Sequence, residues 1–134
     1  MKPAKIIAKC SDGKMKRGYS QDFFPSKPIF HLNKSENGTS QQVEELRMMD
    51  LKALFFVKDF LGNRDHRERK VFLEGERASG RKIEVTFYDG EVLQGSVLAY
   101  NPQQSGFFLF PADPKSNNDR VFVVNSSVRD FRYL

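Results

Sequence analysis

The chain has 134 residues, of which 22 are Lys or Arg and 17 are Asp or Glu, for a formal net charge of +5. This length allows one ordinary domain or two very small ones, and the 13 Phe residues supply enough apolar bulk for a packed core, which excludes global disorder. Apolar runs such as residues 54–57 are too short to span a membrane, and a single cysteine, Cys10, excludes an internal disulfide framework.

The positive charge is concentrated at the N-terminal end. Residues 1–31 carry seven basic and two acidic residues, whereas residues 81–134 carry six of each. A basic face can hold phosphates, and Lys14, Lys16 and Arg17 are the candidate nucleic-acid contacts. The simpler interpretation is a solubilising surface, since no Arg-rich tract accompanies it. No apolar signal segment follows Met1, so we expect a cytoplasmic protein.

An internal repeat organises the chain, because the sequence aligns with itself without a gap at an offset of 77 residues. Asp12-Gly13 aligns with Asp89-Gly90, and Gly18 aligns with Gly95. These are turn and bend positions, where backbone geometry limits the choice of residue. We therefore predict two copies of one motif, at 3–57 and 80–134, joined by a charged, solvated connector at 58–79.

The first copy is predicted to contain five short strands. Ile6 and its neighbours form the first strand, Asp12-Gly13 closes a hairpin, and residues 29–32 form the third strand after a Pro-bearing loop. Residues 43–50 allow two interpretations. Val43, Leu46 and Met49 have the spacing of a helix, but the repeat register favours a strand.

The second copy gives the clearer signal. Ile83, Val85 and Phe87 alternate with polar residues, as in a half-buried strand, and Asp89-Gly90 supplies a tight turn. Gly95 indicates a bend in the returning strand. Further strands are predicted at 107–110, 120–124 and 128–134. Five short strands with a bent second strand are typical of a small, strongly curved barrel.

Two resemblances support this fold. The alternating strand with Gly90 and Gly95, and the late strand pair at 121–124 and Val128 with Phe131, resemble the Sm-like and SH3-like small barrels. Sm proteins commonly carry Arg-Gly at the late turn, where this chain has Asn125-Ser126. The strings DGEVLQG (89–95), GFFLFPADP (106–114) and RVFV (120–123) resemble an uncharacterised bacterial domain family, found alone or attached to signalling proteins, which implies no established activity. The predicted fold class is all-β, with two tandem Sm/SH3-like small barrels packed into one compact unit.

No catalytic constellation is visible in the sequence. His31 is predicted to be an exposed strand residue and His66 a surface residue of the connector, and with Cys10 they lack zinc-ligand spacing. Cys10 aligns with Phe87, which predicts a small buried hydrophobe. Phosphate-binding glycine motifs are absent. We therefore expect no enzymatic activity, no cofactor and no metal site.

Binding is better supported than catalysis. Phe pairs in loops can plug a barrel end or contact a partner, and the Pro- and Asn-rich loop at 110–120 can be held by its own turns or present polar groups. The candidate partner-binding residues are Phe23, Phe24, Phe107, Phe108, Asn117, Asn118 and Arg120.

The predicted function is a non-enzymatic interaction or regulatory module in bacterial signalling, which binds a protein partner through the Pro-bearing loops or an open sheet edge. The first alternative is RNA or DNA binding on the basic N-terminal face. The second is binding of cyclic di-GMP as in PilZ domains, which pair R-x-x-x-R with a later D/N-x-S-x-x-G. Arg77 and Arg81 fit the first motif and Asn125 begins the second, but its final Gly is missing. The partner and the oligomeric state stay open.

Overall fold

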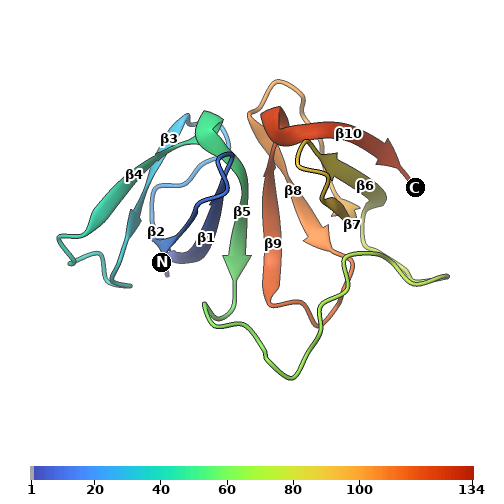
Figure 1. Ribbon diagram of the computed structural model, residues 1–134, viewed down its shortest axis with the longest axis horizontal. Coiled ribbons are helices and arrows are strands. Elements are labelled where there is room, and N and C mark those ends of the chain that lie inside the picture. The colour runs from blue at the N-terminus through green and yellow to red at the C-terminus, as the bar shows by residue number, and fades with distance from the viewer. Residues whose placement is uncertain (1) are drawn as a thin grey trace.

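The computed structural model describes residues 2–134 as a single antiparallel sheet of ten strands, which confirms the all-β class (Figure 1). The first half contains β1 (Ala4–Cys10), β2 (Met15–Ser20), β3 (Ile29–Asn33), β4 (Val43–Arg47), the 3₁₀ turn η1 (Met48–Asp50) and β5 (Leu51–Val57). The second contains β6 (Arg81–Phe87), β7 (Val92–Val97), β8 (Gly106–Pro111), β9 (Asn118–Val124), the turn η2 (Asn125–Ser127) and β10 (Val128–Tyr133). None of the described helical segments has the length and apolar character needed to cross a membrane.

The strand order is β10-β6-β7-β8-β9-β5-β1-β2-β3-β4, so the two halves join where β9 pairs with β5. The sheet is open, because no pairing among residues 2–134 joins its edge strands β10 and β4. In Figure 1, β4 lies in the left half and β10 in the right half, and each runs between the middle of the molecule and its outer side. The hydrogen bonding therefore gives one open sheet, and it does not by itself divide the chain into two closed barrels.

The two halves repeat element for element at the predicted offset of 77 residues. β1, β2, β3, η1 and β5 begin at residues 4, 15, 29, 48 and 51, and their counterparts begin at 81, 92, 106, 125 and 128. Loop contacts repeat too: Ser11 N donates to Asp50 O, as Tyr88 N donates to Ser127 O. Residues 43–47 are a strand, so the repeat register was the better guide to this segment than its helical spacing.

Glycines shape both predicted turns and the bend. Gly13 and Gly90 have φ of 91° and 93°, the left-handed conformation that glycine adopts without a steric penalty. At Gly95 a Cβ atom would lie 2.4 Å from both Leu109 Cδ2 and Phe110 O. Glycine therefore lets β7 approach β8 closely enough for the second half to curl.

Two hydrophobic cores lie inside the two curled halves, and the strands at their junction contribute to both. Phe122 of the second half is fully buried in the first core, whereas Ala53 of the first half is fully buried in the second. Because side chains alternate between the faces of a strand, β5 and β9 each serve two cores. Separating the halves would expose both.

Candidate functional site

A groove lies at the junction of the two halves. Its floor includes a row of apolar side chains across three strands, in which Ile7 pairs with Phe55 and Phe55 with Val121. The alternation of β1 explains this row, since Ile6 and Ala8 fill the first core and Ile7 faces outward. We call it the junction groove, lined by Ile7, Lys9, Met15, Phe55, Leu93 and Val121 and, on the side of the connector and β7, by charged residues that include Glu68, Arg69, Lys70 and Glu91. It has a volume of about 380 Å³.

A second hollow, of about 580 Å³, adjoins the junction groove and shares Lys9 and Met15 with it. It lies between the β1–β2 and β6–β7 turns and is also lined by Tyr88. Met15 and Tyr88 are exposed apolar side chains. Because they share these residues, the two hollows form one continuous depression that extends from the apolar row to the two turns.

Two lysines line this depression, and they differ in whether they form ion pairs. Lys9 Nζ lies 4.7 Å from the centre of the Phe55 ring, a cation–π distance, and Lys9 forms no ion pair within residues 2–134. Lys52 is different, because it sits at a β-bulge and reaches the second half, where its Nζ lies 2.6 Å from Asp89 Oδ2 and also bonds Glu91. Burial acts to lower the pKa of Lys52, but these two hydrogen bonds outweigh it and raise the pKa.

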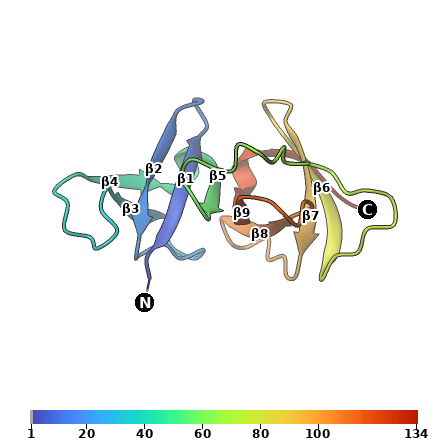
Figure 2. The same ribbon diagram turned by 90° about the horizontal axis from the view of Figure 1, so that it is seen from below.

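The connector is clamped along one side of the groove, as Figure 2 shows in its course from β5 past the second half to β6. The clamp is Asp113, which is 4% exposed. Asp113 Oδ2 lies 2.6 Å from His66 Nε2 and accepts the Arg69 amide at 2.9 Å, while Oδ1 accepts the Lys115 amide at 2.9 Å. Burial alone raises the pKa of Asp113, but these donors outweigh it and lower the pKa to about 2. The charged connector is therefore held against the second half at this point.

Further hydrogen bonds extend the clamp in both directions. Gln94 N donates to Lys70 O at 2.8 Å, and Phe72 N donates to Gln94 Oε1 at 2.9 Å. At the start of the connector, Asn117 Nδ2 donates to Asp59 O at 2.8 Å and Asn117 Oδ1 accepts the Asp59 amide at 3.1 Å. Asn117, a predicted partner contact, therefore holds the chain's own connector.

The predicted aromatic contacts separate into three environments. Phe23 packs edge-on against Phe122 at 5.1 Å between ring centres and lies 6.2 Å from Phe108, so these rings join the two halves. The Arg120 guanidinium caps them at 4.3 Å from the Phe108 ring. Phe24 is exposed beneath Lys27 Nζ.

Phe107 requires a correction. It is 4% exposed and belongs to the second core, so a partner cannot reach it without unfolding β8. Asn118, by contrast, lines the junction groove. Of the seven predicted contacts, Phe24 is thus the one that lies outside the inter-half packing and the connector clamp, whereas Asn118 pairs with Val57 across the junction and also lines the groove.

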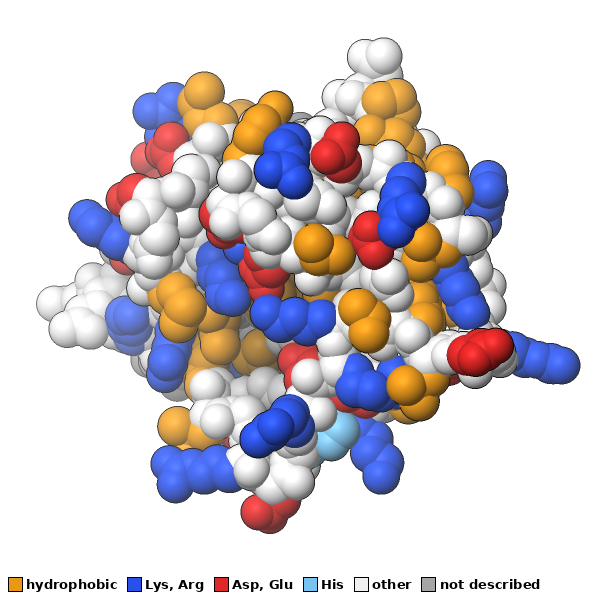
Figure 3. Space-filling view, turned by 45° about the vertical axis from the view of Figure 1, so that its right-hand side comes forward, with side chains coloured by type: hydrophobic (Ala, Val, Ile, Leu, Met, Phe, Trp, Pro, Cys, Tyr) orange, Lys and Arg blue, Asp and Glu red, His pale blue; other side chains and the backbone are white. Residues whose placement is uncertain are grey.

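The basic residues predicted for nucleic acid do not form one face. Lys16 is ion-paired with Glu44, Lys14 lies at the β1–β2 turn, and Arg17 points to the opposite side of β2 from Lys16. Figure 3 shows Lys and Arg side chains scattered among acidic and hydrophobic ones on the side that it presents.

The residues predicted to resemble a cyclic di-GMP site are not brought together. Arg81 begins β6, whereas Tyr88, just beyond its other end, bonds Ser127 beside Asn125. A seven-residue strand separates them by roughly 20 Å. Arg81 instead stacks 3.9 Å over the Tyr133 ring, and Asn125 Nδ2 donates to Gln104 O.

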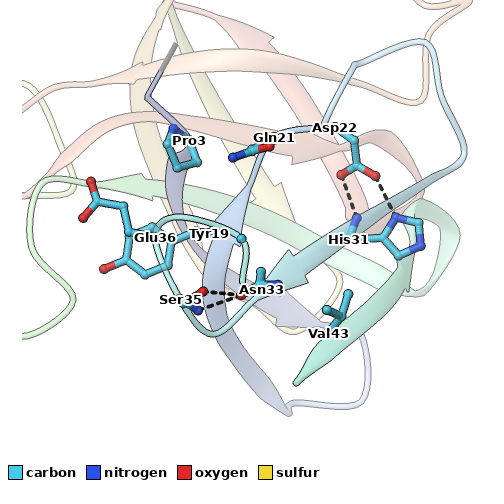
Figure 4. Close-up of a pocket in the computed structure, with 10 residues that line it drawn as sticks. Pro3, Tyr19, Gln21, Asp22, His31, Asn33, Ser35, Glu36 and Val43 are labelled. Atoms are coloured by element: carbon cyan, nitrogen blue, oxygen red, sulfur yellow. Dashed lines mark hydrogen bonds and ion pairs between the residues drawn. The ribbon is translucent and has the colours of Figure 1, made fainter. Parts of the chain in front are cut away.

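A smaller pocket of about 240 Å³ lies beside β2 and β3 and is lined by Tyr19, Asp22 and His31 among others (Figure 4). His31 is partly exposed, as expected, but its Nδ1 lies 2.6 Å from Asp22 Oδ2 and its Nε2 lies 3.4 Å from Glu45 Oε1. The hydrogen bond to Asp22 raises the pKa of His31. No sequence pattern predicts this pairing, because Asp22 lies in a loop nine residues away.

Cys10 is half-buried against the first core, and burial raises the pKa of its thiol. Among residues 2–134, no three His, Cys, Asp or Glu side chains are grouped as they would be around a metal ion.

Comparison with known proteins places the chain in one family. It belongs to a family of unknown function, DUF6982, whose model matches residues 2–134. This confirms the resemblance to an uncharacterised domain family. Neither the curated proteins nor the solved structures contain a match to the chain.

Proposed function

We propose that the protein is a non-enzymatic interaction module of the bacterial cytoplasm, which binds an extended, acidic segment of a protein partner in the junction groove. In this proposal the two halves are small-barrel units of the Sm/SH3 type that share one sheet. The observation that carries it is the partly exposed pair Ile7 and Phe55, which lines an open depression with a cation, Lys9, at its side; Val121 continues this row but is 1% exposed.

The groove suits an extended segment because it continues into the second hollow through Lys9 and Met15 and is flanked by exposed Met15 and Tyr88. Thioether and aromatic side chains adapt to varied apolar surfaces, as binding sites for peptides require. The acidic preference rests on Lys9, which lines both hollows and forms no ion pair within the described residues. An acidic side chain of the partner would give Lys9 a counter-charge.

Nucleic acid is the less favoured partner. Phosphate binding needs several cations on one face, whereas Lys16, Lys52 and Lys70 already have carboxylate partners. The exposed aromatic groups near the groove are also few, so a stacking platform for successive bases has little support.

The test is a selection of binding peptides from a displayed random library, followed by fluorescence-anisotropy titration of the selected peptides. We expect peptides with acidic and apolar residues, whose affinity falls at least tenfold in Lys9→Glu and Met15→Ser. The matched controls are Lys2→Glu and Met49→Ser, which make the same changes at exposed positions outside the junction groove. These should bind as the unmodified chain does.

A single-stranded RNA and a single-stranded DNA serve as competing probes at low and moderate salt. Saturable binding that falls steeply with salt, and that Lys9→Glu weakens no more than Lys2→Glu, would overturn the proposal in favour of a diffuse nucleic-acid contact. Selected peptides that bind equally to all four variants would place the partner site outside the groove.

A further inference from the structure

The open edges of the sheet are the repeat counterparts of the two strands that pair at the junction. Within the molecule, β5 of the first half pairs with β9 of the second. The counterpart of β9 in the first half is β4, and the counterpart of β5 in the second half is β10. These are the two strands with a free edge. The chain therefore contains a second copy of each junction strand, and in these copies, β4 and β10, one edge is unpaired.

Backbone hydrogen bonds along β9 alternate between its two neighbours, and this alternation shows which backbone groups of β9 pair with β5. Asn125 N donates to Ser105 O, so alternate residues of β9, including Val121 and Val123, bond β8. The residues between them, Arg120 and Phe122, face β5, where they pair with Phe56 and Leu54.

The same reasoning identifies the free groups of β4. Met48 N donates to Pro28 O and Lys34 N donates to Gln42 O, and these bonds bracket the β3–β4 ladder. Leu46 and Glu44 therefore bond β3, while the amides and carbonyls of Val43 and Glu45 point to the open edge.

On β10, Leu134 N donates to Lys82 O, so the outward groups are those of Phe131 and Tyr133. Moving the junction register by 77 residues turns Leu54 opposite Phe122 into Phe131 opposite Glu45, and Phe56 opposite Arg120 into Tyr133 opposite Val43. The residues that the repeat would pair are thus the ones whose backbone groups are free.

The side chains on the two edges are also complementary. Tyr133 and Leu134 are 46% and 52% exposed, whereas their counterparts Phe56 and Val57 are each 6% exposed in the junction. In the same register Arg132, which already bonds Glu84 at 2.8 Å, would lie opposite Glu44. The counterpart of the apolar row in the junction groove is therefore a charged row of Glu84, Arg132 and Glu44.

The β-bulge at Lys52 predicts a second ion pair between the two edges. Lys52 bonds Asp89, and their counterparts are Arg129 and Asp12. Asp12 Oδ1 accepts the Lys14 amide just as Asp89 Oδ1 accepts the Glu91 amide. The Oδ2 atom of Asp12 is therefore the counterpart of Asp89 Oδ2, the oxygen that accepts a hydrogen bond from Lys52. Within residues 2–134, Arg129 meets an acid only in its neighbour Asp130, at 3.5 Å.

We propose that copies of this chain associate head to tail, with β10 of one copy paired antiparallel to β4 of the next in the register of the internal junction. Arg129 and Arg132 of one copy then bond Asp12 and Glu44 of the other. The interface is heterologous, because the two surfaces differ, and successive copies form a ring or a filament according to the rotation between them.

The test uses proline to block one edge at a time. Glu45→Pro removes an outward amide of β4, and Tyr133→Pro removes one of β10, while both leave the ladders to β3 and β6 intact. By sedimentation velocity, the unmodified chain should exceed the mass of two copies as concentration rises. Each variant alone should be monomeric, and an equimolar mixture should form a dimer and nothing larger, because it holds one free β10 and one free β4.

A second set of variants exchanges the charges of one ion pair, and it tests the proposal without placing proline in a strand. Asp12→Arg and Arg129→Asp should each weaken association at least tenfold, and the double exchange should restore it to within about threefold. Circular dichroism should show unchanged folding. A monomeric unmodified chain, an oligomer that persists in Glu45→Pro and Tyr133→Pro, or a double exchange that fails to restore association would each overturn the proposal.

Discussion

The connector clamp gives the most quantitative prediction, through the substitution Asp113→Asn. Asp113 is buried and accepts two backbone amides and the His66 ring, and its pKa is about 2. An unfolded chain has an Asp pKa of about 3.9, and each pKa unit corresponds to about 1.4 kcal/mol. The ionised carboxylate therefore contributes about 2.5 kcal/mol to the free energy of unfolding at neutral pH.

The pH dependence follows from the sign of this shift. Between about pH 4 and pH 2 the unfolded chain binds a proton at Asp113 and the folded chain does not, so stability rises with pH in this window. The contribution is complete above about pH 4 and is lost as the pH falls through about 2. Asparagine has no such titration, so the difference between the two proteins should shrink over the same interval.

Urea unfolding followed by circular dichroism at pH 7 and pH 2.5 measures both effects. At pH 7 we expect Asp113→Asn to unfold with a free energy about 2.5 kcal/mol smaller than that of the unmodified chain, and at pH 2.5 the gap should fall to under about half of this. The control is Asp119→Asn, an exposed residue 3.9 Å from Lys58, which should change stability by under about 0.5 kcal/mol. A gap at pH 7 no larger than that of the control, or one that does not change with pH, would refute the reasoning.

Two further predictions concern the turn geometry and the His31 pocket. Gly95→Ala should lower the free energy of unfolding by about 2 kcal/mol or more in urea, since its Cβ would lie 2.4 Å from Phe110 O, a backbone atom that cannot move aside cheaply. His31 should titrate above its ordinary midpoint in an NMR pH series, because Asp22 raises its pKa. The stability gained from protonated His31 is present at low pH and is lost as the pH rises through the folded pKa. Asp22→Asn should return the midpoint toward the ordinary value, and an unchanged midpoint would contradict the hydrogen bond as its cause.

Local signals predicted the elements well. The alternation from Ile83 to Phe87 and the Asp-Gly turns depend on neighbouring residues alone, so they could be interpreted without a partner strand. The repeat added long-range information by transferring the clearer second half onto the first, which is how residues 43–47 were identified as a strand.

The clamp and the His31 pocket could not be predicted in this way. His66 and Asp113 are 47 residues apart, and neither lies in a pattern that points to the other. The loop phenylalanines show a similar limit: periodicity does not say whether a ring covers its own core, joins two halves or faces solvent. Phe107 and Phe108 are adjacent on β8, yet one fills the second core and the other packs against the first.

The junction did leave a signal in the sequence. Residues 53–57 and 121–124 are uninterrupted apolar runs, typical of strands covered on both faces, and residues 106–111 form a third such run. The first two runs are β5 and β9, the pair that joins the halves, whereas the third is β8, which lies inside the second half. Apolar runs thus limit the junction to three candidate strands, and the pairing in the structure distinguishes β5 and β9 from β8.

The edge strands differ from the junction strands in charge, and this difference favours some pairings of edges over others. β4 carries Glu44, Glu45 and Arg47, for a net charge of −1, and β10 carries Arg129, Asp130 and Arg132, for a net charge of +1. Charged side chains on a free edge discourage uncontrolled pairing with other strands. Two β4 edges repel each other and two β10 edges repel each other, whereas a β4 edge and a β10 edge attract. The charges that protect each edge therefore favour the pairing of β4 with β10, which repeats the arrangement of the internal junction.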